Sequence, residues 1–347
     1  MRRFGSSSYS MKHKVALPVT FLVVLFVGTL GKAEVTSQSN TTPEARVERA
    51  TYLESKKDYQ GMITLLAEFK DKIGRKGLVL LADAYGKTGH ANDAVVTLEL
   101  ANARYPKDAQ LQTLYASALA VAGKKETAID MYYKARTTDP KYIPAYDGLL
   151  RQLVQTDSRQ EARDLVSDME KRFGMKPRWA TELCHLYVLD AFHEKAVEAC
   201  NRAMTIDPKN PDNPVHLAAT YREQSEPDKA KNVLIKAAIR IRKSEKIQTA
   251  LGDYFNERKN FIDAYNWYRA AVKSDPRSFN AQLGLAQASL ELQKMEESLE
   301  AFTAACKIKR TAIREFQSGL IRVRNRADVK WQSLFENAIA NHCSTTL

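Results

Sequence analysis

The sequence lacks the short motifs that carry enzymatic chemistry, and it has few residues that interrupt helices. No G-x-S-x-G, P-loop, H-E-x-x-H or C-x-x-C pattern occurs in its 347 residues. Only 14 glycines and 11 prolines are present, whereas 44% of the residues are hydrophobic and 27% are charged. This composition is typical of a helical protein with a buried core. We therefore expect an all-α protein that is not an enzyme.

Histidine and cysteine are also scarce. The 6 histidines are dispersed along the chain without the spacing of metal ligands, so the sequence predicts no metal and no cofactor. The 4 cysteines are Cys184, Cys200, Cys306 and Cys343. Cys184 and Cys200 fall at apolar positions of the repeat described below, which favours free cysteines packed as small apolar residues. Bridges from Cys184 to Cys200 and from Cys306 to Cys343 are the alternatives, because sequence does not fix disulfide geometry.

The first 33 residues have the three-part pattern of a secretory signal peptide. Residues 2–14 are positively charged, residues 15–30 carry no charge, and Gly31 and Ala33 place small residues before Glu34. We expect a signal peptide at 1–33, a flexible linker at 34–43, and export to the bacterial periplasm. The alternative is an uncleaved segment that anchors the chain in the inner membrane.

A period of 34 residues runs through the rest of the chain. One alanine marks each period, at positions 94, 128, 162, 196, 230 and 264, and Ser298 continues the series. The stretch from residue 75 to residue 108 shows the remaining pattern: Leu78, Leu81, Ala82, Tyr85, Ala94, Leu98, Ala101 and Pro106. This spacing resembles the tetratricopeptide repeat, a helix–turn–helix unit of 34 residues.

The resemblance implies an all-α, right-handed superhelical solenoid. Small residues let the two helices of a unit pack closely, and larger residues fill the seams between units, so neighbours stabilise one another. We expect a degenerate N-terminal helix pair at 44–74, with helices at 44–55 and 59–72. Seven 34-residue repeats should follow at 75–312, and C-terminal capping helices at 313–347, near 314–324 and 328–341.

Two parts of this solenoid have features of their own. In the last helix Trp331, Leu334, Phe335 and Ala338 share a face, which should pack against the final repeat. In the repeat at 143–176 the pattern is broken, since Leu150 and Met169 stand where small residues are expected. Larger residues at these places predict a wider crossing of the two helices there.

Tetratricopeptide proteins generally act as scaffolds, and their first helices line a concave groove that receives a peptide or a partner helix. The resemblance places polar residues of several repeats in that groove: Asp147, Arg151, Gln155, Arg178, Thr181, His185, Arg222, Lys246, Asp253 and Asn256. Arg151, Arg178 and His185 form the most positive group and could meet an acidic partner. The alternative is that Asp147 and Glu182 neutralise these charges. No repeat supplies the basic cluster of a chaperone-tail receptor.

The formal net charge is +12, and much of the excess lies near the C-terminus. The residues of this basic surface are Lys307, Lys309, Arg310, Arg314, Arg322, Arg324, Arg326 and Lys330. A second basic group is Lys236, Arg240, Arg242, Lys243 and Lys246. In an exported protein we expect no nucleic-acid partner. The sequence thus predicts a cell-envelope scaffold that binds a protein or peptide in its groove. The alternatives are peripheral binding of anionic membrane or cell-wall polymer through the basic C-terminal end, and self-association.

Overall fold

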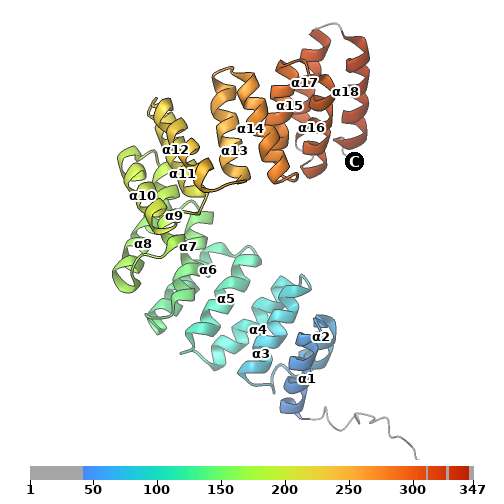
Figure 1. Ribbon diagram of the computed structural model, residues 1–347. Coiled ribbons are helices and arrows are strands. Elements are labelled where there is room, and N and C mark those ends of the chain that lie inside the picture. The colour runs from blue at the N-terminus through green and yellow to red at the C-terminus, as the bar shows by residue number, and fades with distance from the viewer. Residues whose placement is uncertain (1–41, 310–311, 326–327, 344–347) are drawn as a thin grey trace, which may run out of the picture.

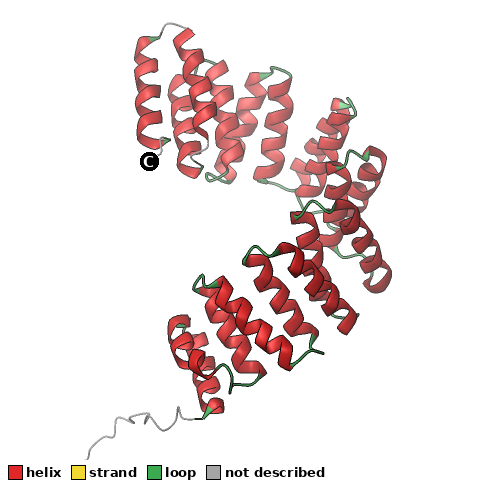
Figure 2. Cartoon of the chain, turned by 180° about the vertical axis from the view of Figure 1, so that it is seen from behind, coloured by secondary structure: helices red, strands yellow, loops and turns green. Residues whose placement is uncertain are grey.

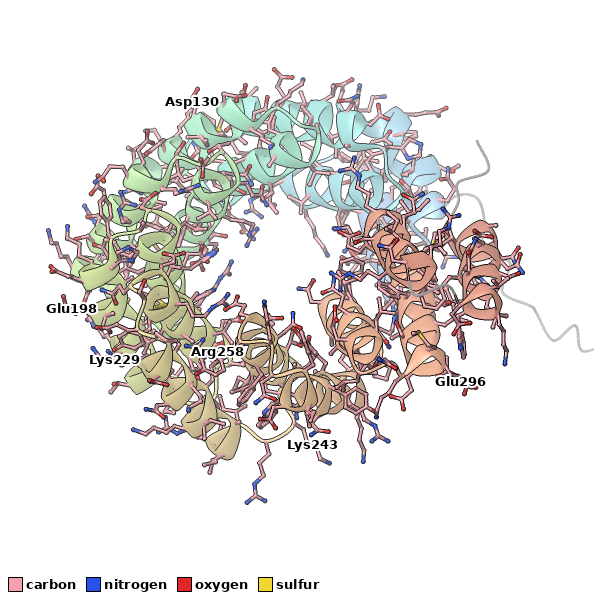
Figure 3. The ribbon with its side chains drawn as sticks, turned by 90° about the horizontal axis from the view of Figure 1, so that it is seen from above. Asp130, Glu198, Lys229, Lys243, Arg258 and Glu296 are labelled. Atoms are coloured by element: carbon pink, nitrogen blue, oxygen red, sulfur yellow. A yellow bond between two sulfur atoms is a disulfide. The ribbon has the colours of Figure 1, made fainter. Side chains whose placement is uncertain are left out.

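The computed structural model describes residues 42–309, 312–325 and 328–343. These residues form 18 α-helices and one short 3₁₀ helix, and they contain no strand (Figures 1 and 2). Successive helix pairs stack side by side and turn around an open centre (Figure 3). The second helices of the pairs form the outer rim, where Asp130, Glu198 and Glu296 lie, while Arg258 at the end of a first helix lies on the inner side. The all-α repeat solenoid expected from the sequence is confirmed.

Each predicted repeat contains one pair of antiparallel helices. The pairs are α3 (Arg75–Lys87) and α4 (Ala91–Arg104), α5 (Ala109–Val121) and α6 (Lys125–Thr138), α7 (Ile143–Gln155) and α8 (Arg159–Phe173), α9 (Pro177–Leu189) and α10 (His193–Ile206), α11 (Asp212–Glu223) and α12 (Pro227–Arg240), α13 (Glu245–Glu257) and α14 (Phe261–Ser274), and α15 (Phe279–Glu291) and α16 (Met295–Ile308). The pair α1 (Pro43–Ser55) and α2 (Tyr59–Leu66) precedes them, and α17 (Ile313–Asn325) and α18 (Val329–His342) follow.

The turn inside each repeat explains why the period is so regular. One residue per turn has a positive φ, and these residues are spaced like the alanines: Gly89, Gly123, Asp157, Ala191, Ser225, Lys259 and Gln293. A left-handed residue at this point ends the first helix and reverses the chain. Only two of the seven are glycine, so the other five turns accept the cost of a side chain in this conformation.

The core of the described residues is divided into five clusters along the solenoid, and the two largest each span several helix pairs. The repeated alanines are at most 4% exposed, and Ser298 is fully buried, where its Oγ donates a hydrogen bond to the carbonyl of Ala286 over 2.8 Å. Serine thus replaces alanine without leaving an unsatisfied donor.

Two expectations for the terminal helices are wrong. Helix α2 ends at Leu66 and continues only as the 3₁₀ turn Ala67–Phe69, although a helix to residue 72 was predicted. The reason is a long-range contact, because the Arg104 guanidinium donates to the carbonyls of Asp71 (2.9 Å) and Ile73 (3.2 Å). In α18, Phe335 is buried and Trp331 packs beside it, but Leu334 is 39% exposed and faces away from the last repeat.

All four cysteines are paired, contrary to the expectation of free thiols. Cys184 is bonded to Cys200 with Cα atoms 4.7 Å apart, and Cys306 to Cys343 with Cα atoms 5.2 Å apart. The first bridge joins α9 to α10, where Cys184 stands at a place of small residues and Cys200 at a place that holds larger apolar residues in the other repeats. The positions that suggested buried free cysteines are therefore the same positions that bring the sulfur atoms together.

The repeat at 143–176 departs from its neighbours as predicted. Helices α7 and α8 make fewer close backbone approaches to each other than the two helices of any other repeat from α3 to α16. Leu150 and Met169 are buried between them. Trp179 of α9 is also buried here, in a group with Tyr146 and Phe173, and its Nε1 donates to Asp147 Oδ1 over 2.7 Å. Large side chains therefore hold this joint open.

Candidate functional site

Many of the polar residues predicted to line the groove bond instead to a neighbouring repeat. Asp147 accepts the hydrogen bond from Trp179, and Thr181 Oγ1 accepts one from Asn210 Nδ2 over 3.0 Å. Lys246 pairs with Asp212 at 2.5 Å, and Arg222 pairs with Glu257. Asp253 Oδ1 accepts a hydrogen bond from Tyr268 Oη over 2.6 Å, and burial raises the pKa of this carboxyl group. The contacts of Asp147, Lys246 and Arg222 thus hold neighbouring repeats together, while those of Thr181 and Asp253 lie within one repeat.

The predicted positive group is only partly assembled. Arg151 and Arg178 are exposed and form no ion pair with any residue in the described part of the chain. His185 is half-buried, and its Nδ1 lies 3.8 Å from Glu182 Oε1. Gln155 is exposed and accepts a bond from Gln152, while Asn256 is half-buried. Two unpaired arginines therefore remain available to an acidic partner.

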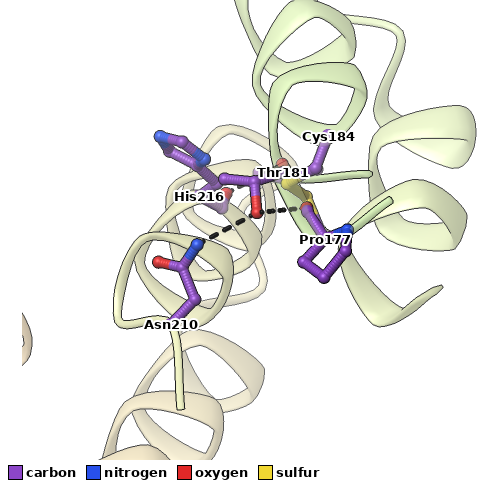
Figure 4. The surroundings of a disulfide bond; sticks show 7 residues. Pro177, Thr181, Cys184, Asn210 and His216 are labelled. Carbon is purple, nitrogen blue, oxygen red and sulfur yellow. Dashed lines mark hydrogen bonds between the residues drawn. A yellow bond between two sulfur atoms is a disulfide. The ribbon is translucent and has the colours of Figure 1, made fainter. Parts of the chain in front are cut away.

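His185 and His216 stack face to face across two repeats. His216 lies in the surroundings of the Cys184–Cys200 bridge (Figure 4). Their ring centroids are 4.6 Å apart and the ring planes differ by 8°. Burial lowers the pKa of His216 from 6.5 to about 4, and the neighbouring His185 adds to this shift. Asp212 and Glu182 oppose the shift, and Lys246 adds to it. His216 is therefore held in its neutral form.

Acidification is expected to weaken this seam. Between pH 6.5 and about 4, the unfolded chain binds a proton at His216 that the folded chain does not. The free energy of unfolding should therefore fall as pH drops through this window, by up to about 3 kcal/mol, and level off below it. Urea unfolding of wild type and His216→Gln across this pH range measures the effect. Parallel stability curves for the two proteins would contradict it.

An apolar groove lies between the first helices of the first two in-register repeats. It has a volume of about 710 Å³, and α3 and α5 scarcely approach each other there. Its floor is the next layer, where Ala94 and Leu98 of α4 are buried. The walls are formed by Val79, Leu80, Gly86, Leu114, Ala118 and Val121. The groove is therefore open because small residues leave the space between two helices unfilled.

The rim of this groove is polar and nearly balanced in charge. Asp83 and Lys87 of α3 are exposed at one side, Glu54 lies at the end of α1, and Ser117 contributes a hydroxyl from α5. Val121 is 75% exposed, which is unusual for an aliphatic side chain in a helix. An apolar floor with a few polar groups at its edge is typical of a site that binds a peptide or a small ligand.

The apolar lining of this groove was not predicted from the sequence, because only polar residues were considered as groove residues. Val79 and Val121 occupy groove-facing positions where most repeats have polar residues, whereas the position of Gly86 is small or apolar in most repeats. Aliphatic or small residues at such positions in two consecutive repeats would have been the signal. The width of the gap between α3 and α5 could not have been read from the sequence.

Part of the positive charge of the basic C-terminal surface is compensated by nearby acidic side chains. Arg322 pairs with Glu291, and Arg324 pairs with Glu336 at 2.6 Å. Lys309 lies over the ring of Phe279, and Lys330 over that of Trp331. Lys307 and Arg314 are exposed. Arg310 and Arg326 lie outside the described residues.

The described ranges contain neither a metal-binding cluster nor a membrane-spanning helix. No group of three or more histidine, cysteine or acidic side chains there could hold a metal ion. None of the helices there is long and apolar enough to cross a membrane. The predicted signal peptide at 1–33 lies outside the described residues, as does most of the linker at 34–43, so export remains a prediction.

Repeated antiparallel helix pairs around a concave face define a helical repeat scaffold. A family model described as tetratricopeptide repeat matches residues 79–143 and 249–313. The chain is a tetratricopeptide-repeat protein. The fold of this family generally mediates the binding of protein partners and is typically not enzymatic.

Solved structures resemble the chain at low sequence identity. A tetratricopeptide repeat protein from Parabacteroides merdae ATCC 43184 has the same fold, with a TM-score of 0.54 and 13% identity, over 72% of this chain and 99% of that chain. A thermophilic tetratricopeptide protein of Thermus thermophilus matches with a TM-score of 0.43 and 18% identity, over 53% of this chain and 100% of that one. No curated protein sequence matches significantly.

Proposed function

We propose that this protein is a cell-envelope scaffold that binds an apolar segment of a partner protein in the groove between α3 and α5. The observation that carries the proposal is the apolar groove of about 710 Å³. The pattern of residues 1–33 supports the location, because it has the form of a secretory signal peptide.

The groove suits a peptide with one or two large apolar side chains. Each fully buried aliphatic or aromatic side chain contributes roughly 1.5–3 kcal/mol, enough to give a weak but specific complex. Asp83 and Lys87 can fix the direction of the peptide, since they carry opposite charges one helical turn apart. Their small net charge means that apolar contact, and not long-range attraction, should dominate the affinity.

Filling the groove is expected to abolish binding without unfolding the protein. A Cβ atom added at Gly86 meets no atom within 4 Å, so Gly86→Ala should stabilise α3 by roughly 0.5–1 kcal/mol. Gly86→Trp keeps the helical backbone but places a large ring where the peptide would lie. Peptides selected by phage display on the full chain provide the probe, and fluorescence anisotropy measures their affinity. Gly86→Trp should weaken binding by at least about tenfold.

Matched variants locate the binding surface. Val121→Asp, at the groove, should weaken binding as Gly86→Trp does. Val96→Asp, an equally simple change at a 51% exposed valine on α4 outside the groove, should leave it unchanged. Arg151→Glu with Arg178→Glu tests the unpaired arginines of the neighbouring repeats. Selected peptides that bind Gly86→Trp normally but fail on the double arginine variant would move the site away from α3 and α5.

A further inference from the structure

The outer side of the junction between α12 and α13 carries four cations without partners. Lys236 and Arg240 lie on α12, and Arg242 and Lys243 follow in the turn. All four are exposed, and none forms an ion pair with a residue at 42–309, 312–325 or 328–343. Lys243 lies on the outer rim of the solenoid (Figure 3), away from the concave groove. We call this region the outer junction surface.

The two other repeats with a cation at the position of Arg240 pair it with an acid, whereas Lys107, Lys141, Lys209 and Arg277, at the position of Lys243, are exposed and form no ion pair with a described residue. Arg104 and Arg172 occupy the same place in their repeats as Arg240. Arg104 lies 3.4 Å from Asp71 Oδ1, and Arg172 donates to Asp168 Oδ1 over 2.7 Å. At the outer junction surface the acid nearest in sequence, Glu245, instead accepts hydrogen bonds from Thr249 and Ser278. The positive charge there is therefore left uncompensated by the fold.

Apolar recesses lie beside these cations. A cleft of about 180 Å³ between α12, α13 and α14 is lined by Ile235, Ala238, Ile239, Ile241, Lys243, Ser244, Ile247, Gln248 and Trp267. Ile247 is fully buried, whereas Ile239 is 71% exposed. A second cleft, of about 200 Å³, lies across α12, and Lys236 and Arg240 belong to its lining. Each cleft has room for one large apolar side chain.

We propose that the outer junction surface is a second docking site, which binds an acidic segment of a partner protein through an apolar anchor residue. Charge complementarity selects an anionic partner, because four exposed cations follow one another within residues 236–243 and none of them forms an ion pair with a described residue. The apolar surface is recessed, with Ile247 buried and Trp267 half-buried in the cleft. A recess accepts an inserted side chain, whereas a flat anionic bilayer would reach only the protruding Ile239. The observations therefore favour a peptide.

The test uses the full chain and two defined fluorescein-labelled peptides. One has a single leucine between two runs of four glutamates, and the other has serine in place of the leucine. Burial of the leucine should make its peptide bind about tenfold more tightly at moderate salt. Ile239→Ser should remove that preference, and Arg240→Glu with Lys243→Glu should abolish the binding of both peptides. Quenching of Trp267 fluorescence reports the insertion directly.

Matched controls separate this site from general charge attraction. Lys134→Glu with Lys171→Glu removes two exposed lysines from other second helices, and Ile262→Ser removes a 65% exposed isoleucine outside the cleft. Both variants should bind like wild type. Equal affinity for the two peptides would overturn the proposal. The proposal would also fail if the double variant Arg240→Glu with Lys243→Glu bound vesicles of phosphatidylglycerol and phosphatidylcholine more weakly than wild type but bound both peptides equally well. The groove variant Gly86→Trp should have no effect here, so the two sites are tested separately.

Discussion

Replacing both Cys306 and Cys343 by serine is expected to release the C-terminal helix pair from the solenoid. The bridge joins α16 to the residue that follows α18, across 37 residues that include both capping helices. Closing a loop of this length contributes roughly 3–4 kcal/mol in the chain-entropy treatment. Among the described residues this pair packs only against α15 and α16, so no second interface there compensates for the loss. Local opening should increase by roughly 100- to 1,000-fold, measured by hydrogen exchange of α17 and α18.

Loss of the Cys306–Cys343 bridge should also expose the aromatic cluster between α16, α17 and α18. Phe302 of α16 stacks on Phe316 of α17, and Phe335 of α18 meets both rings edge to face. When α18 leaves, these rings become exposed, and binding of a dye such as ANS should rise. Wild type treated with a reductant should behave like the serine variant, which separates loss of the bridge from the effect of a buried hydroxyl.

The second bridge provides the matched comparison. Cys184 and Cys200 are 16 residues apart within one repeat that has neighbours on both sides. Replacing them should raise exchange in α9 and α10 but leave α17 and α18 unchanged. If thiol titration shows Cys306 and Cys343 fully reduced while exchange in α17 and α18 stays at its wild-type rate, the stabilising role of the bridge is wrong.

The fold could be predicted because one short pattern is repeated many times. Small residues at close helix contacts and a fixed turn position specify every in-register pair, whether or not the turn residue is glycine. The early end of α2 could not be predicted, because it depends on Arg104, about 30 residues farther along the chain. The sequence also left open whether the cysteines form disulfides, because a buried free cysteine and a disulfide-bonded one can occupy the same position.

The functional surfaces were harder to predict because the sequence shows which residues are polar but not what they contact. Lys246 and Asp212 are 34 residues apart, and Arg222 and Glu257 are 35 apart, so each pair spans one period. A search for opposite charges one period apart would have removed these residues from the predicted groove. Arg151 keeps a free charge because no acid stands 34 or 35 residues away from it, and Arg178 keeps one because Asp212, 34 residues farther along, pairs with Lys246 instead.

Tyr268 occupies the seam where a single substitution is expected to cost the most. Its side chain is 2% exposed, and the ring lies between Gly252 of its own repeat and Gly284 of the next. A Cβ atom at Gly252 would lie 2.6 Å from the ring, and one at Gly284 would lie 2.3 Å from it. Removing the ring by Tyr268→Ala should lower the free energy of unfolding by roughly 3–5 kcal/mol. It also leaves the buried Asp253 without its hydrogen bond.

Gly252 and Gly284 lack the side chains that would clash with the Tyr268 ring. Adding a side chain at one of them therefore overfills the seam, whereas removing the ring empties it. Gly284→Val overfills the seam and should cost roughly 1–3 kcal/mol or more, whereas Gly86→Val, where nothing lies within 4 Å, should change the stability by only a few tenths of a kcal/mol. In the double variant Tyr268→Ala with Gly284→Val, the added side chain enters the cavity left by the ring. Denaturant unfolding should then show a loss smaller than the sum of the two single losses. Strict additivity would mean that ring and glycine do not share this space. Such a result would remove the physical reason for a glycine at this point of the seam.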